Sequence, residues 1–497
     1  SASQADERDG QYGFGNIQSP GSGYIQGIPE ASANGLSYGR NQSESVSLLD
    51  DNEQETEISD FVIQSTGTNV DYEADINQDT AKIGKKQKFR NNIEAIKLAK
   101  ELYAIKQKAL AEQKNFTITK EEQQILSKFS GWGGISEAFD ERKDDWTNEY
   151  KELKTLLSDD EYKQARASTT SAFYTPNFIV DTMYKAVNRI GLNLDNNTKK
   201  VLEPSAGNGV FLSRLDHRHH DGYYKFDTAE IEPISNKFLN LLYPSANVFS
   251  SEYGFQDIKI SNKTKYDLVI GNPPYANIRI LDKDNADISG MMIHNYFANK
   301  SMKHLKDNGI MALVITHNFL DNPHSKAREK LGEHSTFLGA VRLPNTAFKD
   351  EAKTEIVTDI VFFQKSLRNK RTEKDFISVS ETLDANGKSY QINTYFKENP
   401  QNVLGKLEVV SSQFGFELTC KEDPDINLQQ ALDEFIAREL PEKIYEYSHN
   451  NEENENELYV SKFNKEYQAN FDYFENLKAD SFVIFNNEIC RKRQSPF

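Results

Sequence analysis

The residues best suited to chemistry lie in the segment YDLVIGNPPYANI, which spans residues 266–278. Its apolar first half predicts a buried strand, and Asn272, Pro273, Pro274 and Tyr275 follow where that strand ends. Two consecutive prolines stiffen the backbone and remove two N–H donors, so an amide oxygen, a carbonyl oxygen and an aromatic ring stand in fixed relation. Such a group can accept two N–H bonds and stack on a flat ring, which suits an amino group on a planar substrate. Taken alone, the segment is also compatible with an Asn-Pro turn that simply ends the strand.

A second segment, VLEPSAGNGVFLSRL at residues 201–215, predicts a strand, a loop containing Gly207 and Gly209, and a helix. In a doubly wound sheet such a loop binds nucleotide-like ligands, because glycine lets the backbone approach the ligand closely. The spacing matches neither the GxGxxG nor the Walker A pattern, which disfavours dinucleotides and nucleoside triphosphates. Glu203 precedes the glycines and would suit a cationic group on the ligand.

The elements that would position these loops alternate between strands and helices from about residue 171 to residue 365. The expected strands are KKVLEPSA, YKFDTAEIE, YDLVIGN, IMALVIT, FLGAVRL and TDIVFFQK. Each is rich in β-branched or aromatic residues, and helical segments such as HNYFANKSMKHLKD separate them, as in a parallel sheet with crossovers. The sequence therefore predicts the α/β class, a Rossmann-like doubly wound sheet with an N-terminal helical region and a smaller C-terminal α+β region.

Composition divides the chain into four expected parts: an acidic disordered tail at 1–81, a basic helical region at 82–165, the α/β domain at 166–370 and a C-terminal region at 371–497. The tail holds 15 Asp/Glu against 2 Arg and shows no sustained period. Residues 82–114 hold 10 Lys/Arg against 3 Glu and predict one long amphipathic helix. The apolar stripe along it comprises Ile93, Ile96, Ala99, Leu102, Tyr103 and Ile105. Its lysines form either a solvated face or a surface that contacts phosphates.

The 497 residues carry a formal net charge of −17, much of it in the tail, so the acidity of the whole chain does not exclude a nucleic-acid partner. Cys420 and Cys490 lie seventy residues apart with no CxxC pattern, which predicts ordinary thiols and no metal site. No apolar run is long enough to cross a membrane, and the first residues lack a basic stretch followed by an apolar one. We therefore expect a cytoplasmic protein without a membrane partner.

Taken together, EPSAGNG at residues 203–209, EIE at 230–232 and NPPY at 272–275 resemble the S-adenosylmethionine-dependent adenine-N6 DNA methyltransferases. FYTP at 173–176 precedes the glycine loop, which resembles the gamma-type order of motifs. Much of residues 129–365 is also similar to the methylase portion of phage- and plasmid-borne methylase-helicase proteins. The segments that carry this similarity are FSGWGG, EYKQARASTTSAFYTP, IHNYFANKSMKHLKDNGIMALVIT, LGAVRLPNTAFK and TEIVTDIVFFQK. No Walker A motif or other helicase signature is found, so DNA translocation is not expected.

The resemblance implies S-adenosyl-L-methionine as the cofactor and residues 166–370 as the methyltransferase domain. The cofactor-binding residues that it implies are Tyr174, Thr175, Pro176, Glu203, Ala206, Gly207, Glu230, Ile231, Asp257 and Asn272. Within this set, Thr175 and Pro176 would lie by the methionine carboxylate, and the residues of the glycine loop would contact the amino-acid part.

Acidic residues would meet the nucleoside part of the cofactor. Glu230 would accept bonds from both ribose hydroxyls, and Glu232 is its alternative because the segment offers two acids. Asp257 would accept a bond from the adenine amino group, with Phe255 or Ile258 packed on the ring.

The resemblance also implies that Asn272, Pro273, Pro274 and Tyr275 are the catalytic residues and that the substrate is adenine in DNA. The adenine amine is a poor nucleophile because its lone pair is delocalised into the ring. If the Asn272 side-chain oxygen and the Pro273 carbonyl accept its N–H bonds, the nitrogen turns toward tetrahedral geometry and its lone pair can face the methyl donor. The base must leave the duplex stack, and Tyr275 would stack on it. No general base and no metal are expected.

DNA is thus the expected partner, with a possible protein partner through the acidic tail or the C-terminal region, which is also a candidate target-recognition module. Two alternatives stay open: a methyltransferase acting on RNA bases or protein glutamine, and a catalytically idle DNA-binding subunit of a mobile-element defence system. Arg342 and Lys349 could face DNA or pack within a late strand and its turn, and His294 could line the site or cap a helix. A surface loop is expected for His217, His219 and His220.

Overall fold

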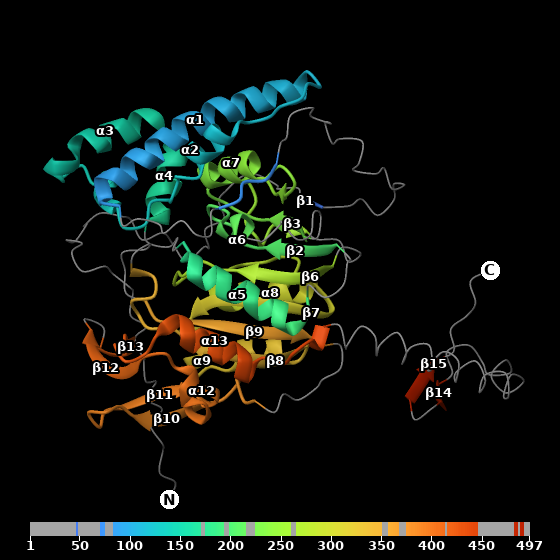
Figure 1. Cartoon of the computed structure of the whole chain (residues 1–497). Coiled ribbons are helices and arrows are strands. Elements are labelled where there is room, and N and C mark those ends of the chain that lie inside the picture. Colours follow the sequence, from blue (N-terminus) through green and yellow to red (C-terminus); the bar gives the residue numbers. More distant parts are fainter. Residues whose placement is uncertain are drawn as a thin grey trace, which may run out of the picture. The chain divides into compact units, whose positions relative to one another are not determined.

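The structure is a computed structural model with two compact units, Ser1–Glu442 and Lys443–Phe497. The residues that it describes are 46–47, 70–74, 83–169, 174–192, 198–214, 224–259, 265–349, 356–366, 374–412, 415–445, 482–485 and 488–491. The first unit holds a central sheet with helices packed on it (Figure 1). In the second unit, β14 (Phe482–Phe485) and β15 (Glu488–Arg491) form an antiparallel pair.

Seven strands form the central sheet in the order β4-β3-β2-β6-β7-β9-β8. Neighbouring strands from β4 to β7 are parallel, and β9 runs antiparallel between β7 and β8. The strands are β2 (Lys199–Glu203), β3 (Tyr224–Thr228), β4 (Asn247–Val248), β6 (Tyr266–Gly271), β7 (Leu305–Thr316), β8 (Ser335–Arg342) and β9 (Thr358–Lys365). All six expected strands and the doubly wound α/β class are confirmed. The sequence does not predict β4, because two residues are too few to show a period.

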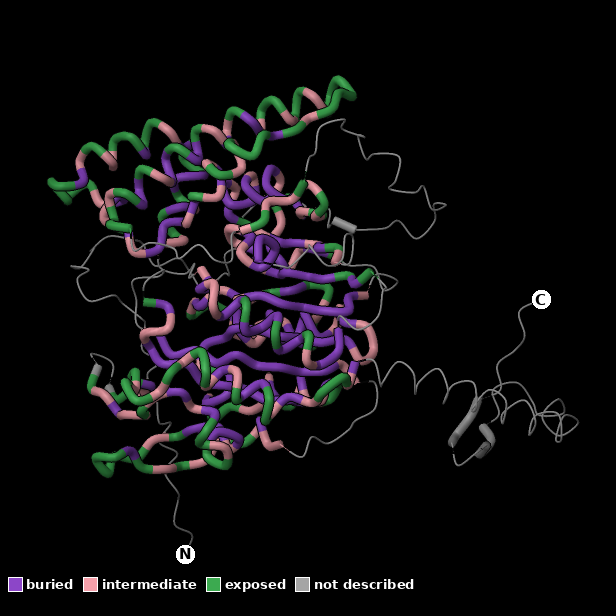
Figure 2. Tube along the Cα trace, viewed as in Figure 1, coloured by how far each residue is buried: buried purple, intermediate pink, exposed green. Residues whose placement is uncertain are grey.

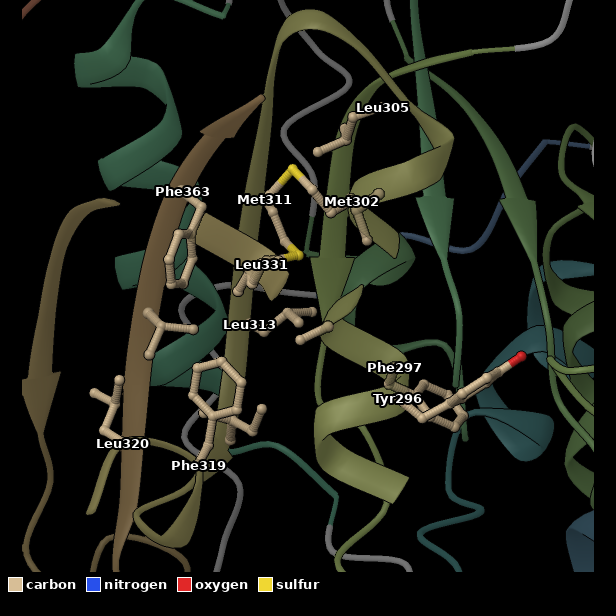
Figure 3. Close-up of a cluster of buried hydrophobic side chains, with 14 of the residues drawn as sticks. Tyr296, Phe297, Met302, Leu305, Met311, Leu313, Phe319, Leu320, Leu331 and Phe363 are labelled. Atoms are coloured by element: carbon tan, nitrogen blue, oxygen red, sulfur yellow. The ribbon is translucent and has the colours of Figure 1, made fainter. Parts of the chain in front are cut away.

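The core lies along the sheet, whose strands are mostly buried (Figure 2). Every residue of β6 is buried, which is why its sequence is a continuous apolar run instead of an alternating one. Figure 3 shows part of the buried cluster to which Phe297, Met311 and Leu313 belong. The Tyr296 ring is in the same cluster, but its hydroxyl points out of it and donates a hydrogen bond to Asp282 Oδ2.

Helices pack on the sheet and on one another through apolar faces. They are α5 (Asn177–Ile190), α6 (Val210–Ser213), α7 (Pro233–Leu242), α8 (Ile293–His304), α9 (Asn318–Asp321), α10 (Lys326–Gly332) and α13 (Leu428–Glu439). α5 and α8 both contact β7, and α13 packs on α5. Gly191 ends α5 in the left-handed region, with φ of 106°.

The first four helices of the described chain pack on α7 or on one another (Figure 1). They are α1 (Lys85–Ala111), α2 (Lys120–Leu126), α3 (Thr147–Leu156) and α4 (Asp159–Ser168). α2 and α4 begin with capping boxes, in which Thr119 pairs with Glu122 and Ser158 with Glu161. This local sequence signal explains why both helices start where they do.

α1 confirms the expected long basic helix, and Ile93, Ile96, Ala99 and Leu102 of its apolar stripe are buried. Ile105 is 49% exposed, so its predicted place in that stripe is wrong. The reason is its place on the helix: Ile105 lies one turn after the exposed Glu101, whereas Lys106 beside it faces α7 and donates to the Asn240 carbonyl at 2.6 Å.

Several lysines of α1 form ion pairs with neighbouring helices. Lys97 Nζ lies 2.7 Å from Glu152 and Lys100 Nζ lies 2.6 Å from Glu161. These contacts favour the packed, solvated face over the phosphate-contacting surface as the role of the basic stripe.

Two hairpins follow the sheet and attach next to β8 (Figure 1). They and the helix between them are β10 (Val379–Leu383), β11 (Ser389–Asn393), α12 (Thr394–Glu398), β12 (Lys406–Ser412) and β13 (Gly415–Lys421). Asn345 N–H donates to the Cys420 carbonyl at 2.7 Å, which ties β13 to the segment after β8.

Part of the predicted disordered tail is hydrogen-bonded to the first unit. Tyr72 N–H donates to the Leu242 carbonyl and Ala74 N–H to the Ser213 carbonyl, both at 2.8 Å. β1 (Val46–Ser47) pairs in parallel with β5 (Ile258–Lys259). The prediction of disorder is therefore wrong for these residues, because backbone pairing, which composition does not reveal, holds them; the rest of 1–81 lies outside the described residues.

Arg342 does not face DNA, contrary to one of its two interpretations. Its Nε and Nη2 donate to Asp359 at 2.8 and 2.9 Å, and its Nη1 lies 2.7 Å from Asp321 Oδ2. The side chain is completely buried because two carboxylates from neighbouring elements compensate its charge inside the core. Lys349 is exposed.

Cys420 is buried, and burial raises the pKa of its thiol to about 12, in keeping with an ordinary thiol. The Cys490 side chain and the predicted histidine loop, with His217, His219 and His220, lie outside the described residues. No described helix is long and apolar enough to cross a bilayer, and no group of His, Cys, Asp and Glu among the described residues is arranged to hold a metal ion. The cytoplasmic location and the absence of a metal stay predictions.

Candidate active site

The glycine loop after β2 is fixed to the end of β3. Ala206 N–H donates to the Ala229 carbonyl at 2.9 Å, and Ala229 N–H donates to the Glu203 carbonyl at 3.0 Å. Gly207 and Gly209 have φ of 54° and 79°, a region that glycine enters without strain. The loop therefore lies at the carboxyl end of the sheet, where doubly wound folds bind ligands.

Of the two acids offered for ribose recognition, Glu230 faces the glycine loop and Glu232 does not. Glu230 accepts bonds from Gly207 N–H and from Glu232 N–H, each at 2.7 Å. The Glu232 carboxylate caps α7 instead, accepting from Ile234 N–H at 3.1 Å and from Ser235 N–H at 2.7 Å. The geometry thus favours Glu230 over its alternative.

Acidic groups with raised pKa values gather beside the glycine loop. Glu203 is 1% exposed, and its Oε2 has no hydrogen-bond partner among the described residues. Burial, and then the neighbouring Glu230, raise the pKa of Glu203 well above its usual value. Burial raises the pKa of Glu230 to about 7, against the effect of its two backbone N–H partners. Because a buried acid with an unpaired oxygen is costly, a donor or cation on a ligand would be favourable here.

Tyr174 lies against two glycine turns at once. A Cβ at Gly131 would lie 1.8 Å from Cε2 of the ring, and a Cβ at Gly207 would lie 2.9 Å from Cε1. Asn92 of α1 holds the first turn, because its Nδ2 donates to the Gly131 carbonyl at 2.8 Å and its Oδ1 accepts from Ser130 N–H at 3.0 Å. The N-terminal helices therefore help to build the site, which the sequence analysis missed. The glycine-rich FSGWGG segment is the signal that could have indicated it.

The NPPY loop lies beside the glycine loop. β2 and β6 are adjacent parallel strands, so their carboxyl ends meet at one edge. Ser205 Oγ donates to the main-chain carbonyl of Asn272 at 3.2 Å. A Cβ at Gly271 would lie 3.5 Å from Glu203 Cγ and 3.5 Å from Pro204 Cδ. Two motifs about seventy residues apart in the chain are thus in direct contact.

Tyr275 does not present an open aromatic face. Its side chain is only 7% exposed, and its hydroxyl donates to Asn272 Oδ1. Burial raises the pKa of this hydroxyl well above its usual value. Stacking of Tyr275 on an extruded base stays a prediction; in this conformation the buried hydroxyl takes the acceptor that Asn272 offers. Asn272 itself is half-buried.

Three further predicted residues differ in exposure. Thr175 and Pro176 are buried directly before α5. Ile231 is 38% exposed beside Glu230, so it offers apolar surface next to the acid proposed for ribose.

Asp257 closes its own turn. Its Oδ2 accepts from Gly254 N–H at 3.1 Å and from Gln256 Nε2 at 2.8 Å, which is the turn-forming use of aspartate. Phe255 and Ile258 both belong to the buried cluster, at 4% and 2% exposure, so neither offers much surface to a ring.

His294 lies in the first turn of α8, whose N-cap is Met292. Its side chain is buried, and Nε2 has no partner among the described residues. Burial lowers the pKa of this imidazole to about 4, so His294 is neutral near pH 7. It is therefore not the helix cap.

The loop chemistry fits S-adenosylmethionine, which carries ribose hydroxyls, an amino group and a sulfonium. Glu203 Oε2 and Asn208 Oδ1 are buried acceptors without partners among the described residues, and both belong to the glycine loop segment. Glu230 offers a carboxylate to hydroxyl donors, and the exposed Ile231 offers apolar contact. Because Gly207 has no Cβ, the Tyr174 ring packs directly against the backbone of the loop.

The strand order, with one antiparallel strand inserted next to the sheet edge, and the glycine loop after the first strand are those of the class I S-adenosylmethionine-dependent methyltransferase fold. S-adenosylmethionine is accordingly its cofactor. The model of the Eco57I restriction-modification methylase family matches residues 46–348, more than half of the chain. The chain belongs to this family.

Individual relatives are distant. The chain is 28% identical over 254 residues to "Defense against restriction protein B" of Escherichia phage P1, a match that covers 50% of this chain and 9% of that protein. It is 24% identical over 293 residues to the type II methyltransferase M.HincII of Haemophilus influenzae, covering 54% of this chain and 53% of that protein. A type I restriction-modification methyltransferase subunit from Streptococcus thermophilus aligns with a TM-score of 0.34 at 16% identity, over 60% of this chain and 66% of that one. The chain thus spans only part of the length of each.

Proposed function

We propose that this protein is a DNA adenine-N6 methyltransferase, which transfers the methyl group of S-adenosylmethionine to the exocyclic amine of an adenine turned out of the duplex. Membership of a restriction-modification methylase family supports DNA as the substrate. The NPPY sequence at 272–275, through its resemblance to amino-methyltransferases of adenine, supports an amine on a planar base as the acceptor.

The observation that carries the proposal is the contact between the two loops. Ser205 Oγ donates to the Asn272 carbonyl at 3.2 Å, so the residues proposed for the cofactor and those proposed for the substrate amine share one edge of the sheet. Transfer between two bound molecules requires such proximity, because holding the reactants together removes most of the entropic barrier.

The proposed chemistry depends on two acceptors. S-adenosylmethionine supplies a methyl group made electrophilic by its positively charged sulfur. Asn272 Oδ1 and the Pro273 carbonyl would accept the two N–H bonds of the adenine amine and localise its lone pair on nitrogen. The amine nitrogen would form its bond to the methyl carbon with that lone pair while the carbon–sulfur bond breaks and its electron pair goes to sulfur, which leaves S-adenosylhomocysteine. The nitrogen would then lose one proton, which passes to water. No side chain of the loop has to take up the proton.

Tyr275 would change partners in this scheme. Its hydroxyl takes one of the two lone pairs of Asn272 Oδ1 in the structure, so turning the ring outward would leave the amide oxygen fully available to adenine. Turned outward, the same ring would stack on the extruded base. Rotation of one side chain would therefore free the acceptor and provide the stacking surface together.

Acidic residues would hold the cofactor. Glu230 would accept the ribose hydroxyls with the lone pairs that its two backbone partners leave unused. Glu203 and Asn208 would accept bonds from the amino-acid end, which would satisfy the two buried oxygens described above.

A product assay tests the proposal and its alternatives together. The protein is incubated with methyl-labelled S-adenosylmethionine and either DNA from a methylation-deficient bacterium, total RNA or a glutamine-containing peptide. We expect label in DNA, recovered as N6-methyl-2′-deoxyadenosine after digestion to nucleosides. Label in RNA or peptide alone would replace the proposal with the alternative substrates. Calorimetry without any S-adenosylmethionine binding would favour the catalytically idle subunit.

A further inference from the structure

The NPPY loop continues into a hairpin-like segment, residues 276–292, that leaves the carboxyl edge of the sheet and runs along α8, where Asp287 pairs with Lys303 near the end of that helix. Ile280 N–H donates to the Met291 carbonyl at 3.0 Å, and Gly290 N–H returns a bond to the Ile280 carbonyl at 2.7 Å. Ile293 N–H donates to the Ile278 carbonyl at 2.9 Å where α8 begins. The segment therefore has a defined backbone and is joined directly to the proposed substrate site.

A buried ion pair fixes the base of this segment. Asp282 is 4% exposed and accepts bonds from Asp284 N–H at 2.8 Å and Asn285 N–H at 2.9 Å. Lys300 of α8, which is 2% exposed, reaches Asp282 Oδ2 at 3.4 Å and also donates to the Gln256 carbonyl at 3.0 Å. Asp282 thus anchors the chain to the core immediately after Leu281.

The residues just before this anchor expose apolar surface. Leu281 is 63% exposed and Ile278 is 37% exposed, although both lie in a segment held by main-chain bonds. The core anchor at Asp282 prevents Leu281 from folding inward. An exposed leucine six residues after Tyr275, followed directly by a buried anchor, resembles the apolar wedges with which proteins unstack base steps.

The charges on the segment favour a polyanionic partner. Asp284 lies 3.4 Å from Lys259 Nζ, and Asp287 lies 2.6 Å from Lys303 Nζ, so lysines of other elements offset both acids. Arg279 and Lys283 are exposed, and neither forms an ion pair with a carboxylate in the described part of the chain; Arg279 Nη1 donates to the Gly290 carbonyl at 2.9 Å. Lysines of other elements thus offset all three aspartates of residues 276–292. The positive charges of Arg279 and Lys283 remain on the surface of the segment, in a protein whose formal net charge is −17.

The geometry points to residues 278–283 as a DNA-contacting wedge, an inference that rests on the proposed function. Leu281 would press into the base stack next to the extruded adenine, and Arg279 and Lys283 would contact the flanking phosphates. The wedge would lower the cost of extrusion without touching the cofactor. A protein partner is the competing occupant, and it predicts no effect of Leu281 in a purified reaction.

The test uses duplexes that carry the methylated sequence mapped in the wild-type reaction. In one duplex the target adenine is paired with thymine, and in the other it faces an abasic site, which lowers the cost of extrusion. Leu281→Ala is compared with Leu281→Met and with Leu110→Ala, which removes another exposed leucine (45%) at the end of α1. The readouts are kcat/KM for methyl transfer on each duplex and the dissociation constant of S-adenosylmethionine.

We expect Leu281→Ala to lose about tenfold in kcat/KM on the paired duplex, because a wedge offsets only part of the cost of unstacking. On the abasic duplex it should approach the wild type, and cofactor binding should be unchanged. Leu281→Met, which keeps an apolar tip, and Leu110→Ala should resemble the wild type on both duplexes. Equal activity of Leu281→Ala on the paired duplex, or equal losses on both duplexes, would overturn the inference. Absence of transfer by the wild type to either duplex would instead refute the proposed function, and the inference with it.

Discussion

The hydroxyl of Ser205 donates a hydrogen bond to the main-chain carbonyl of Asn272, 3.2 Å away. This bond joins the glycine loop after β2 to the loop that ends β6, and both loops lie at the carboxyl edge of the sheet. The site is therefore a product of strand order, because two strands distant in sequence must be neighbours for their loops to meet.

Tyr275 gives the first prediction. Tyr275→Phe removes the bond to Asn272 Oδ1 but keeps the ring, so it should lower the free energy of unfolding by about 1 kcal/mol while methyl transfer is retained. Tyr275→Ala also removes the ring and should weaken binding of DNA with an extruded adenine by roughly 1–3 kcal/mol. Thermal melts and titrations with 2-aminopurine at the target position measure both effects. Equal DNA binding by Tyr275→Ala and the wild type would exclude stacking.

Gly131 gives the second prediction, which links the N-terminal helices to the cofactor. Gly131→Ala would place a Cβ 1.8 Å from the Tyr174 ring, so the ring must move and S-adenosylmethionine should bind about tenfold more weakly, or about 1.4 kcal/mol. Gly387→Ala is the matched control, since Gly387 also has positive φ (77°) but nothing within 4 Å of the added Cβ. It should bind the cofactor like the wild type.

A double-mutant cycle separates this effect from a loss of folding. If Gly131→Ala acts through Tyr174, then combining it with Tyr174→Ala should weaken cofactor binding no further than Tyr174→Ala alone. Additive losses in calorimetry would contradict the link.

The acids around Glu230 give a prediction of pH dependence. The pKa of Glu230 is raised from 4.5 to about 7, so its carboxylate, the form that accepts the ribose hydroxyls, is lost as pH falls below about 7. S-adenosylmethionine should then bind more weakly by up to about tenfold per pH unit. The neighbouring carboxyl of Glu203, whose pKa is also raised, acts in the same direction. Calorimetry between pH 6 and pH 8.5 measures the slope, which Glu230→Gln should reduce.

The raised pKa of Glu230 also predicts how the stability of the protein without cofactor depends on pH. A carboxyl whose pKa is raised by folding stabilises the fold fully at pH values below its unfolded pKa, and this contribution disappears as pH rises through the folded pKa. The melting temperature should therefore fall between about pH 5 and pH 8 in the wild type and fall less in Glu230→Gln. A steeper fall of the melting temperature in Glu230→Gln than in the wild type would contradict a pKa of Glu230 that is raised by folding.

The sequence predicts the sheet and the position of both loops because most strands are apolar or aromatic stretches, and β2 and β6 run directly into segments rich in Gly, Pro and Asn. It does not predict where Tyr275, Gly131 and Arg342 lie. Arg342 can be buried because Asp321 and Asp359, which come from other elements, compensate its charge. Gly131 belongs to the site because the Tyr174 ring packs against it. Such contacts between distant segments leave no local period or motif, so only the folded chain reveals them.

The most direct test of the account is methyl transfer by Asn272→Ala. If the Asn272 side chain holds the adenine amine, the variant should lose most of its turnover on adenine-containing DNA while binding S-adenosylmethionine like the wild type. Asn91→Ala, which removes a half-buried asparagine of α1, should keep full turnover. Turnover by Asn272→Ala equal to that of the wild type would contradict the central claim.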